Sequence, residues 1–191
     1  IAPELRAANA GGVLLSRQLH TFGLGESDLG ARIADLMQRG RNPEVGTTAQ
    51  YGQVGVRINS AAATRAAAQA LLDETEAELR HRLGTVVFGR DEDTLGGVVG
   101  ALLLARGSKL STAESCMGGL IGSLLTDVRG SSRYYVGGVV SYANNAKVDL
   151  LGVEPAALSA HGAVSEVVAC AMAGGAARRF HTDYAVSVTG I

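Results

Sequence analysis

Aromatic residues and cysteines are scarce in this sequence. Its 191 residues include no Trp, 3 Phe and 5 Tyr, although hydrophobic residues make up 47% of the chain. Any hydrophobic core must therefore be built mainly from Ala, Val and Leu. The 2 Cys are too few for a disulfide framework, and the 4 His show no metal-ligand spacing with them.

The sequence also lacks an excess of charge and a long apolar run. The formal net charge of −1 gives no electrostatic reason to expect nucleic acid or an acidic membrane as a partner. No apolar run reaches the length that spans a bilayer, and no signal-peptide pattern opens the chain. We therefore expect a cytoplasmic protein.

What the sequence does contain is a glycine-rich turn with a serine, over residues 111–120 (S-T-A-E-S-C-M-G-G-L). It follows an apolar run that ends at Leu110, and it opens onto residues 120–125, which predict a helix. Backbone amides in the first turn of a helix lack partners and favour negative charge. This layout places the Ser115 hydroxyl where it could attack a carbonyl while neighbouring amides receive the oxyanion. The alternative is a strand-to-helix turn without chemistry.

The run from Glu114 to Gly190 resembles the C-terminal domain of the CinA family, an amidase that deamidates nicotinamide mononucleotide. The likeness extends upstream through residues 23–27, so it covers nearly the whole chain. The matching pieces occur in the same order, and they are residues 113–119, 130–132, 137–142, Lys147, 151–153, 162–165 and 189–191. The resemblance implies hydrolysis of the nucleotide's carboxamide to nicotinic acid mononucleotide and ammonia, in pyridine nucleotide salvage.

The family's catalytic serine, tyrosine and lysine match Ser115, Tyr142 and Lys147. A serine hydroxyl needs a base at neutral pH, and lysine can serve when burial lowers its pKa well below roughly 10.4. We expect Tyr142 at a strand end and Lys147 at the following helix start, in the crevice where α/β sheets bind ligands. Apart from the resemblance, Tyr142 would be an ordinary strand aromatic and Lys147 a solvated surface lysine.

Five further residues are expected to line the substrate site: Glu114, Gly118, Gly119, Thr189 and Gly190. Glu114 would orient the turn or bind substrate, and the paired glycines would let the backbone approach a phosphate or ribose. No metal and no cofactor is expected for the amidase.

Other residues near the turn leave alternatives open. Cys116 is a rival nucleophile, because a thiolate is favoured at a helix N-terminus. His161 and His181 are the only histidines of this domain, and their local sequence is typical of surface residues, which disfavours a Ser-His-Asp triad. Met117 departs from the family, which usually has threonine there, so one hydroxyl is lost.

The expected fold class is α/β, with a layered α/β/α amidase domain over residues 90–191 that is truncated at its C-terminus. A small α+β, KH-like module is expected before it, over residues 42–89. Residues 1–41 are expected to be the C-terminal remnant of a molybdopterin-binding-like domain. The remnant and the KH-like module are what the family resemblance implies. The residues themselves indicate a break at Asn42-Pro43, a strand at 54–58, an Ala-rich helix after Ser60 and a polar junction at residues 90–93.

The KH-like module carries a possible nucleic-acid signature, G-x-x-G at residues 52–55. A loop that clamps backbone phosphates lies between two helices, whereas this one falls in a predicted strand. No basic cluster surrounds it, so we predict a structural spacer. The expected partner is a small-molecule nucleotide, with neither nucleic acid nor a membrane, and a homodimer is left open.

Two other functions remain open from the sequence. One is an ADP-ribose pyrophosphatase whose active domain, with any divalent metal, precedes Ile1, the amidase part being inactive. The other is a non-enzymatic interaction protein linked to competence or DNA damage, as the family's name suggests.

Overall fold

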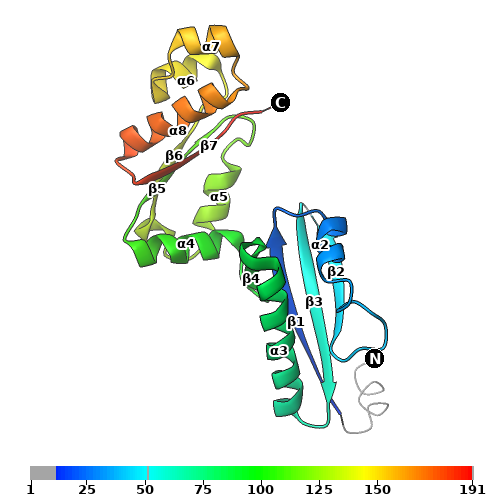
Figure 1. Ribbon diagram of the computed structural model, residues 1–191. Coiled ribbons are helices and arrows are strands. Elements are labelled where there is room, and N and C mark those ends of the chain that lie inside the picture. Colours follow the sequence, from blue (N-terminus) through cyan, green and yellow to red (C-terminus); the bar gives the residue numbers. More distant parts are fainter. Residues whose placement is uncertain (1–11, 51, 191) are drawn as a thin grey trace, which may run out of the picture. The chain divides into compact units, whose positions relative to one another are not determined.

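The computed structural model describes residues 12–50 and 52–190, which form two compact units that divide after Leu95 (Figure 1). Each unit has its own sheet and its own hydrophobic core. The predicted α/β class is confirmed, with an α+β unit first and a layered α/β unit second. The division lies close to the predicted start of the second domain at residue 90.

The first unit is an antiparallel four-stranded sheet in the order β2-β3-β1-β4, covered by helix α3. Strands β1 and β3 pair along their whole length. Thr64 begins α3, where its side chain accepts a hydrogen bond from the Ala67 amide, and Gly84 ends the helix with a positive φ. The elements are β1 (Val13–Phe22), α2 (Glu26–Arg32), β2 (Glu44–Gln50), β3 (Gln53–Ala62), α3 (Arg65–Leu83), η1 (Gly84–Val86) and β4 (Val87–Arg90).

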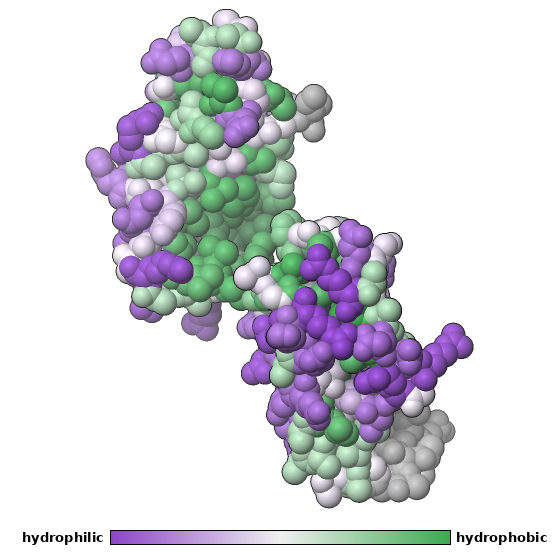
Figure 2. All heavy atoms as spheres, viewed as in Figure 1, coloured by the Kyte–Doolittle hydropathy of each residue, from purple (hydrophilic) through white to green (hydrophobic). Residues whose placement is uncertain are grey.

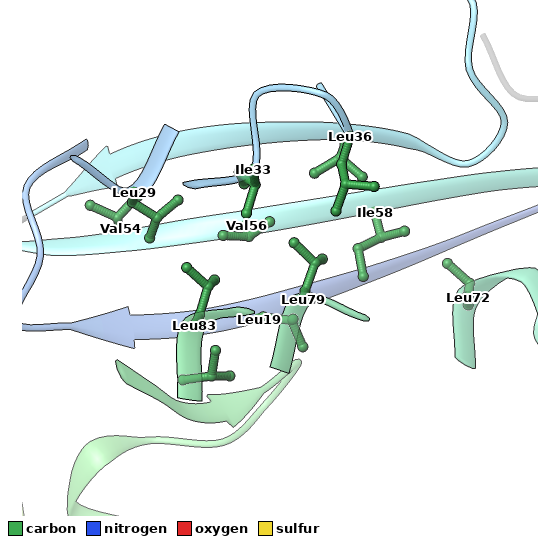
Figure 3. Packing of buried hydrophobic residues seen from close by; sticks show 12 residues of the cluster. Leu19, Leu29, Ile33, Leu36, Val54, Val56, Ile58, Leu72, Leu79 and Leu83 are labelled. Carbon is green, nitrogen blue, oxygen red and sulfur yellow. The ribbon is translucent and has the colours of Figure 1, made fainter. Parts of the chain in front are cut away.

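The core of the first unit lies between this sheet and its helices (Figure 3). Leu19 of β1, Val56 of β3 and Leu79 of α3 are fully buried there. Leu29 and Ile33, from the segment that holds α2, are fully buried in the same cluster. Among the residues that the structure describes, this core is therefore filled by aliphatic side chains and holds no aromatic residue.

Residues 13–41 belong to this unit, which corrects the expected boundary after residue 41. Strand β1 lies between β3 and β4 in the sheet, so the module has no continuous sheet without it. The segment containing α2 contributes to the same core. Of the G-x-x-G pattern, Gly52 lies in the turn between β2 and β3, and the rest lies in β3 rather than between two helices.

A buried ion-pair cluster joins α3 to β1 and β4. The Glu76 carboxylate accepts hydrogen bonds from Arg17 at 2.6 Å, Arg80 at 2.7 Å and Arg90 at 3.4 Å. Arg17 also donates to Asp73 at 2.8 Å. Burial opposes ionisation of Glu76, but the hydrogen bonds and positive charges of Arg80 and Arg17 outweigh it and lower the pKa of this carboxyl.

Replacing Glu76 with Ala should therefore destabilise the first unit. It leaves the Arg17 guanidinium, whose side chain is 9% exposed, without its shortest ion pair. We expect the free energy of unfolding, measured by urea denaturation at pH 7, to fall by about 3 kcal/mol. The pKa of the Glu76 carboxyl is lower in the folded protein than in the unfolded chain. The stabilisation that the Glu76 ion pairs contribute is therefore complete above about pH 4.3, the pKa of an unperturbed glutamate, and is lost as pH falls through the folded-state pKa.

The Glu78→Ala variant is the matched control for Glu76→Ala. Glu78 lies on the same helix and forms an exposed pair with Arg82 at 2.6 Å. An exposed pair at this spacing contributes about 0.3–0.5 kcal/mol. Equal losses from the two variants would contradict the special role of Glu76.

The second unit is a parallel three-stranded sheet in the order β6-β5-β7. Strand β5 contains the end of the apolar run that precedes the serine turn, and β6 ends two residues before Tyr142, where a strand end was expected. The elements are α4 (Leu95–Arg106), β5 (Leu110–Glu114), α5 (Leu120–Thr126), η2 (Ser131–Arg133), β6 (Tyr135–Val140), α6 (Asn144–Leu151), α7 (Pro155–His161), α8 (Glu166–Phe180) and β7 (Tyr184–Val188).

Helices cover both faces of this sheet. On one face α8 packs against β5 and β7, with α6 and α7 beside it, and Ala113, Val168 and Met172 are fully buried there. On the other face Leu110 of β5 packs with Leu103 of α4 and Leu125 of α5. A parallel sheet covered on both faces has continuously buried central strands, and all five residues of β5 are buried.

Part of the second face carries exposed apolar side chains. A cavity of about 390 Å³ lies between α4 and β7, and Leu102, Tyr184 and Val186 in its lining are between 44% and 52% exposed. In Figure 2 the second unit shows a green apolar area, whereas purple hydrophilic residues cover much of the first unit.

Candidate active site

The parallel sheet brings three segments together at the carboxyl ends of its strands. Ser115 follows β5, and its amide donates to the carbonyl of Val188 in β7 at 2.9 Å. Ser141 follows β6, and its amide donates to the Glu114 carbonyl at 2.8 Å. Segments distant in sequence therefore meet where α/β sheets bind ligands.

The side chain of Lys147, in α6, is buried, and its amine lies beside these strand ends. Its side chain is 1% exposed. Its Nζ lies 2.8 Å from the Ser141 carbonyl oxygen, 3.0 Å from the Tyr142 carbonyl oxygen and 3.1 Å from Ser115 Oγ. The predicted convergence of Ser115 and Lys147 is therefore present.

The surroundings of Lys147 favour its neutral form. Burial is the main cause and lowers the pKa of the Lys147 amine, while the nearby Cys116 acts in the opposite direction. A neutral amine has two N–H donors and one lone pair. In the structure Nζ donates to both carbonyls and to Ser115 Oγ. Once the amine has lost a proton, the two carbonyls can keep its two N–H groups, which leaves the lone pair for the Ser115 hydroxyl proton. This arrangement suits a general base.

Glu114 orients the turn, which is one of the two roles expected for it. Its side chain is 1% exposed, and its carboxylate accepts hydrogen bonds from the amides of Gly119 at 3.1 Å, Ile121 at 3.0 Å and Gly122 at 2.9 Å. The expectation that the start of α5 binds an external anion is therefore wrong for these three amides, because an internal carboxylate occupies them.

Two amides beside the serine remain unengaged. The Ser115 amide donates to Val188, and the Gly118 amide donates to the Ser115 carbonyl at 3.3 Å. Within residues 12–50 and 52–190, the amides of Cys116 and Met117 have no hydrogen-bond partner. Gly118 and Gly119 have φ values of 61° and 103°, which favour glycine, so the pair sets the bend between turn and helix.

Of the remaining predicted residues, Gly190 lies beside the serine turn, whereas the side chains of Thr189 and Tyr142 make other contacts or face solvent. A methyl group placed on Gly190 would lie 3.2 Å from Cys116 Sγ, so Gly190 borders the turn. The Thr189 hydroxyl donates to the Ala163 carbonyl at 2.8 Å. The Tyr142 side chain is 79% exposed, and this residue meets Lys147 through its carbonyl oxygen rather than its phenol.

The rival residues lack the contacts of the serine–lysine pair. Cys116 is an exposed free thiol, whereas the Lys147 amine bonds the neighbouring Ser115. His161 ends α7 and His181 follows α8, and both are exposed, as predicted.

Sequence reasoning assigned no role to Ser141. Its carbonyl makes the shortest contact with Lys147 Nζ, and its Oγ is buried without a partner among the residues the structure describes. A backbone carbonyl leaves no signature in a sequence. The one available signal was position, since Ser141 ends the predicted strand directly before Tyr142.

The described residues hold neither a metal-binding cluster nor a membrane-spanning helix. Across residues 12–50 and 52–190, no three His, Cys, Asp or Glu side chains are grouped so as to hold a metal ion. None of the helices in these ranges has the length and apolar character that crossing a bilayer requires.

Fold and site together define an antiparallel α+β unit followed by a layered α/β unit with a buried serine–lysine pair at its strand ends. The CinA C-terminal domain family matches residues 92–191, and the KH domain family of the damage-inducible protein CinA matches residues 16–89. The chain belongs to the CinA family. The KH match includes most of β1 and all of α2, in agreement with the corrected boundary.

Relatives match along nearly the whole chain. A competence-damage inducible protein of Symbiobacterium thermophilum is 49% identical over 193 residues, which cover 100% of this chain and 45% of the relative. A CinA-like protein of Synechococcus sp. (strain CC9902) is 44% identical over 190 residues, covering 99% of this chain and 45% of the relative. The chain thus spans less than half the length of these relatives.

A solved structure matches about half of the chain. The crystal structure of the competence/damage inducible protein CihA from Agrobacterium tumefaciens is 45% identical, with a TM-score of 0.50. The match covers 51% of this chain and 59% of that one.

Proposed function

We propose that this chain carries an amidohydrolase site that converts nicotinamide mononucleotide to nicotinic acid mononucleotide and ammonia, in pyridine nucleotide salvage. The observation that carries the proposal is the buried contact of 3.1 Å between Lys147 Nζ and Ser115 Oγ. A hydroxyl paired with an amine of lowered pKa is an activated nucleophile. The choice of substrate rests on the family resemblance.

The first half of the reaction forms an acyl-enzyme. Lys147 takes the Ser115 hydroxyl proton while Oγ bonds to the carboxamide carbon, and negative charge moves onto the carboxamide oxygen. Cys116 and Met117 directly follow Ser115, and their amides have no partner among the described residues. These two amides would donate hydrogen bonds to that oxyanion. The C–N bond then breaks, the Lys147 ammonium gives its proton to the departing nitrogen, and ammonia leaves.

The second half of the reaction restores the serine. Lys147, again neutral, takes a proton from water as the water oxygen attacks the acyl carbon. The bond to Oγ breaks, Oγ regains the proton from Lys147, and the nicotinate carboxyl is released. The chain's own residues thus supply the nucleophile, the base and the oxyanion donors. Tyr142 keeps a role through its carbonyl, which holds one N–H of the amine.

Trapping the acyl-enzyme tests this proposal directly. With nicotinamide mononucleotide, the full-length protein should release ammonia and nicotinic acid mononucleotide in equal amounts. Added hydroxylamine should divert part of the acyl group to the hydroxamate without slowing ammonia release, because it competes with water after ammonia has left.

Two outcomes would contradict the acyl-enzyme proposal. Ammonia release without any hydroxamate would replace the acyl-enzyme with direct attack by water. No ammonia release at all would favour one of two other functions. One is a role in competence or DNA damage, as the relatives' names suggest, and the other is pyrophosphate hydrolysis of ADP-ribose elsewhere in the full-length protein.

A further inference from the structure

The carboxylate of Glu114 is buried directly before the proposed nucleophile. Glu114 is the last residue of β5, and its side chain is 1% exposed. Within residues 12–50 and 52–190, its carboxylate bonds backbone amides and no cationic side chain. Oε2 accepts from Gly119 and Ile121, and Oε1 accepts from Gly122.

These three bonds close the serine turn onto the strand that precedes it. Residues 115–118 lie between the Glu114 backbone and the amides that its side chain holds. At the other end of the turn, the Ser115 amide is fixed to Val188 of β7. Both ends of the four-residue turn are therefore held by hydrogen bonds.

The packing around Gly122 shows how closely this carboxylate approaches α5. A methyl group on Gly122 would lie 2.8 Å from the Tyr135 hydroxyl and 3.5 Å from Glu114 Oε1. A side chain at this position would clash with the Tyr135 hydroxyl, whereas its distance from the carboxylate is that of an ordinary van der Waals contact. The carboxylate therefore packs directly against the start of α5.

We propose that Glu114 is a positioning residue for the amidase. By occupying three amides at the start of α5, it fixes the turn so that the two amides after Ser115 stay available for an oxyanion. It also keeps the anionic groups of a substrate away from the amides of Gly119, Ile121 and Gly122. This inference rests on the proposed function, and it assigns Glu114 no contact with the reacting atoms.

The Glu114→Gln variant tests this role in the full-length protein. Glutamine keeps the size of the side chain but offers one acceptor oxygen, so at least one of the three amides then faces an NH₂ group. Removing one oxyanion donor costs about 10²–10³ in kcat, and a loosened turn should cost about 10–100-fold. We expect KM for nicotinamide mononucleotide to change little, because the effect falls on the transition state.

Two readouts separate positioning from a purely structural role. The value of kcat is expressed per folded molecule, with the folded fraction taken from circular dichroism. The pH midpoint of kcat should stay that of the native protein, because the bonds of Lys147 to Ser141 and Tyr142 do not use the Glu114 carboxylate. Glu114→Asp, which keeps both acceptor oxygens, should recover part of the lost kcat.

Thr64→Ala is the matched control, because Thr64 caps α3 in the first unit with its side chain. It should lower the melting temperature of that unit and leave kcat unchanged. If the native protein releases ammonia and Glu114→Gln keeps the native kcat per folded molecule, the positioning role is wrong and the proposed function stands. A rise in KM with kcat unchanged in Glu114→Gln would also overturn the positioning role. If the native protein releases no ammonia, the proposed function itself fails.

Discussion

Replacing Ser115 with Ala should abolish the release of ammonia from nicotinamide mononucleotide, with kcat falling by about 10⁴–10⁶-fold. The alanine removes the only atom that forms the acyl bond, while the amides and Lys147 remain. Ser115 is 6% exposed and follows the fully packed strand β5, so losing one hydroxyl should change the fold little. The measurement is a coupled assay of ammonia, with the nicotinic acid mononucleotide product quantified by chromatography.

Two matched variants make the Ser115 result specific. Ser123→Ala removes an exposed hydroxyl from α5 in the same unit and should retain native kcat. Cys116→Ala removes the rival nucleophile and should remain active. Full activity of Ser115→Ala, or loss of activity only in Cys116→Ala, would transfer the nucleophilic role to the thiol.

Replacing Lys147 with Met should lower kcat by about 10³-fold or more, because the reaction loses both its general base and its general acid. Methionine fills nearly the same volume without an amine in the buried site. The chain's only other lysine, Lys109, is exposed, so Lys109→Met is a matched control that should retain native kcat. Arginine at position 147 keeps a positive charge but cannot give up its proton, so Lys147→Arg should be as inactive as the methionine variant.

The pH dependence follows from the same lysine. Burial lowers the pKa of Lys147 in the folded protein, so kcat should rise with pH through a midpoint below the value of about 10.4 for a free lysine. Between the folded pKa and that value, the unfolded chain binds more protons than the folded one. Stability should therefore rise with pH in this window.

Substantial activity of Lys147→Arg would mean that the positive charge, not proton transfer, is what matters. A kcat that does not vary with pH below about 10.4 would also contradict the base role.

Ser115 could be singled out from a local pattern, a glycine-rich turn between a predicted strand and a predicted helix. Lys147 could not, because its own sequence context is that of a surface lysine, and the family resemblance supplied it. The capping role of Glu114 was harder to foresee, because it depends on the path that the backbone takes five to eight residues later. The carbonyl of Ser141 was missed because backbone groups do not depend on residue type.

The fold shows the same limit. The apolar run Val13-Leu14-Leu15 is compatible with a strand, but it does not indicate which strand it would pair with. Its partner β3 begins at Gln53, and α2 and β2 lie between them in the chain. Local periodicity carries no information on such distant pairing, so it gives no reason to place residues 13–41 in the same unit as residues 42–89.

The meeting of three strand ends has a consequence for how activity emerges during folding. The contact between Ser115 and Lys147 spans 32 residues, and the bond from Ser115 to β7 joins residues still further apart. Such non-local contacts form only once the intervening chain has been ordered. Turnover should therefore appear on refolding together with the native parallel sheet, so the enzyme assay would report tertiary assembly of the second unit rather than helix formation.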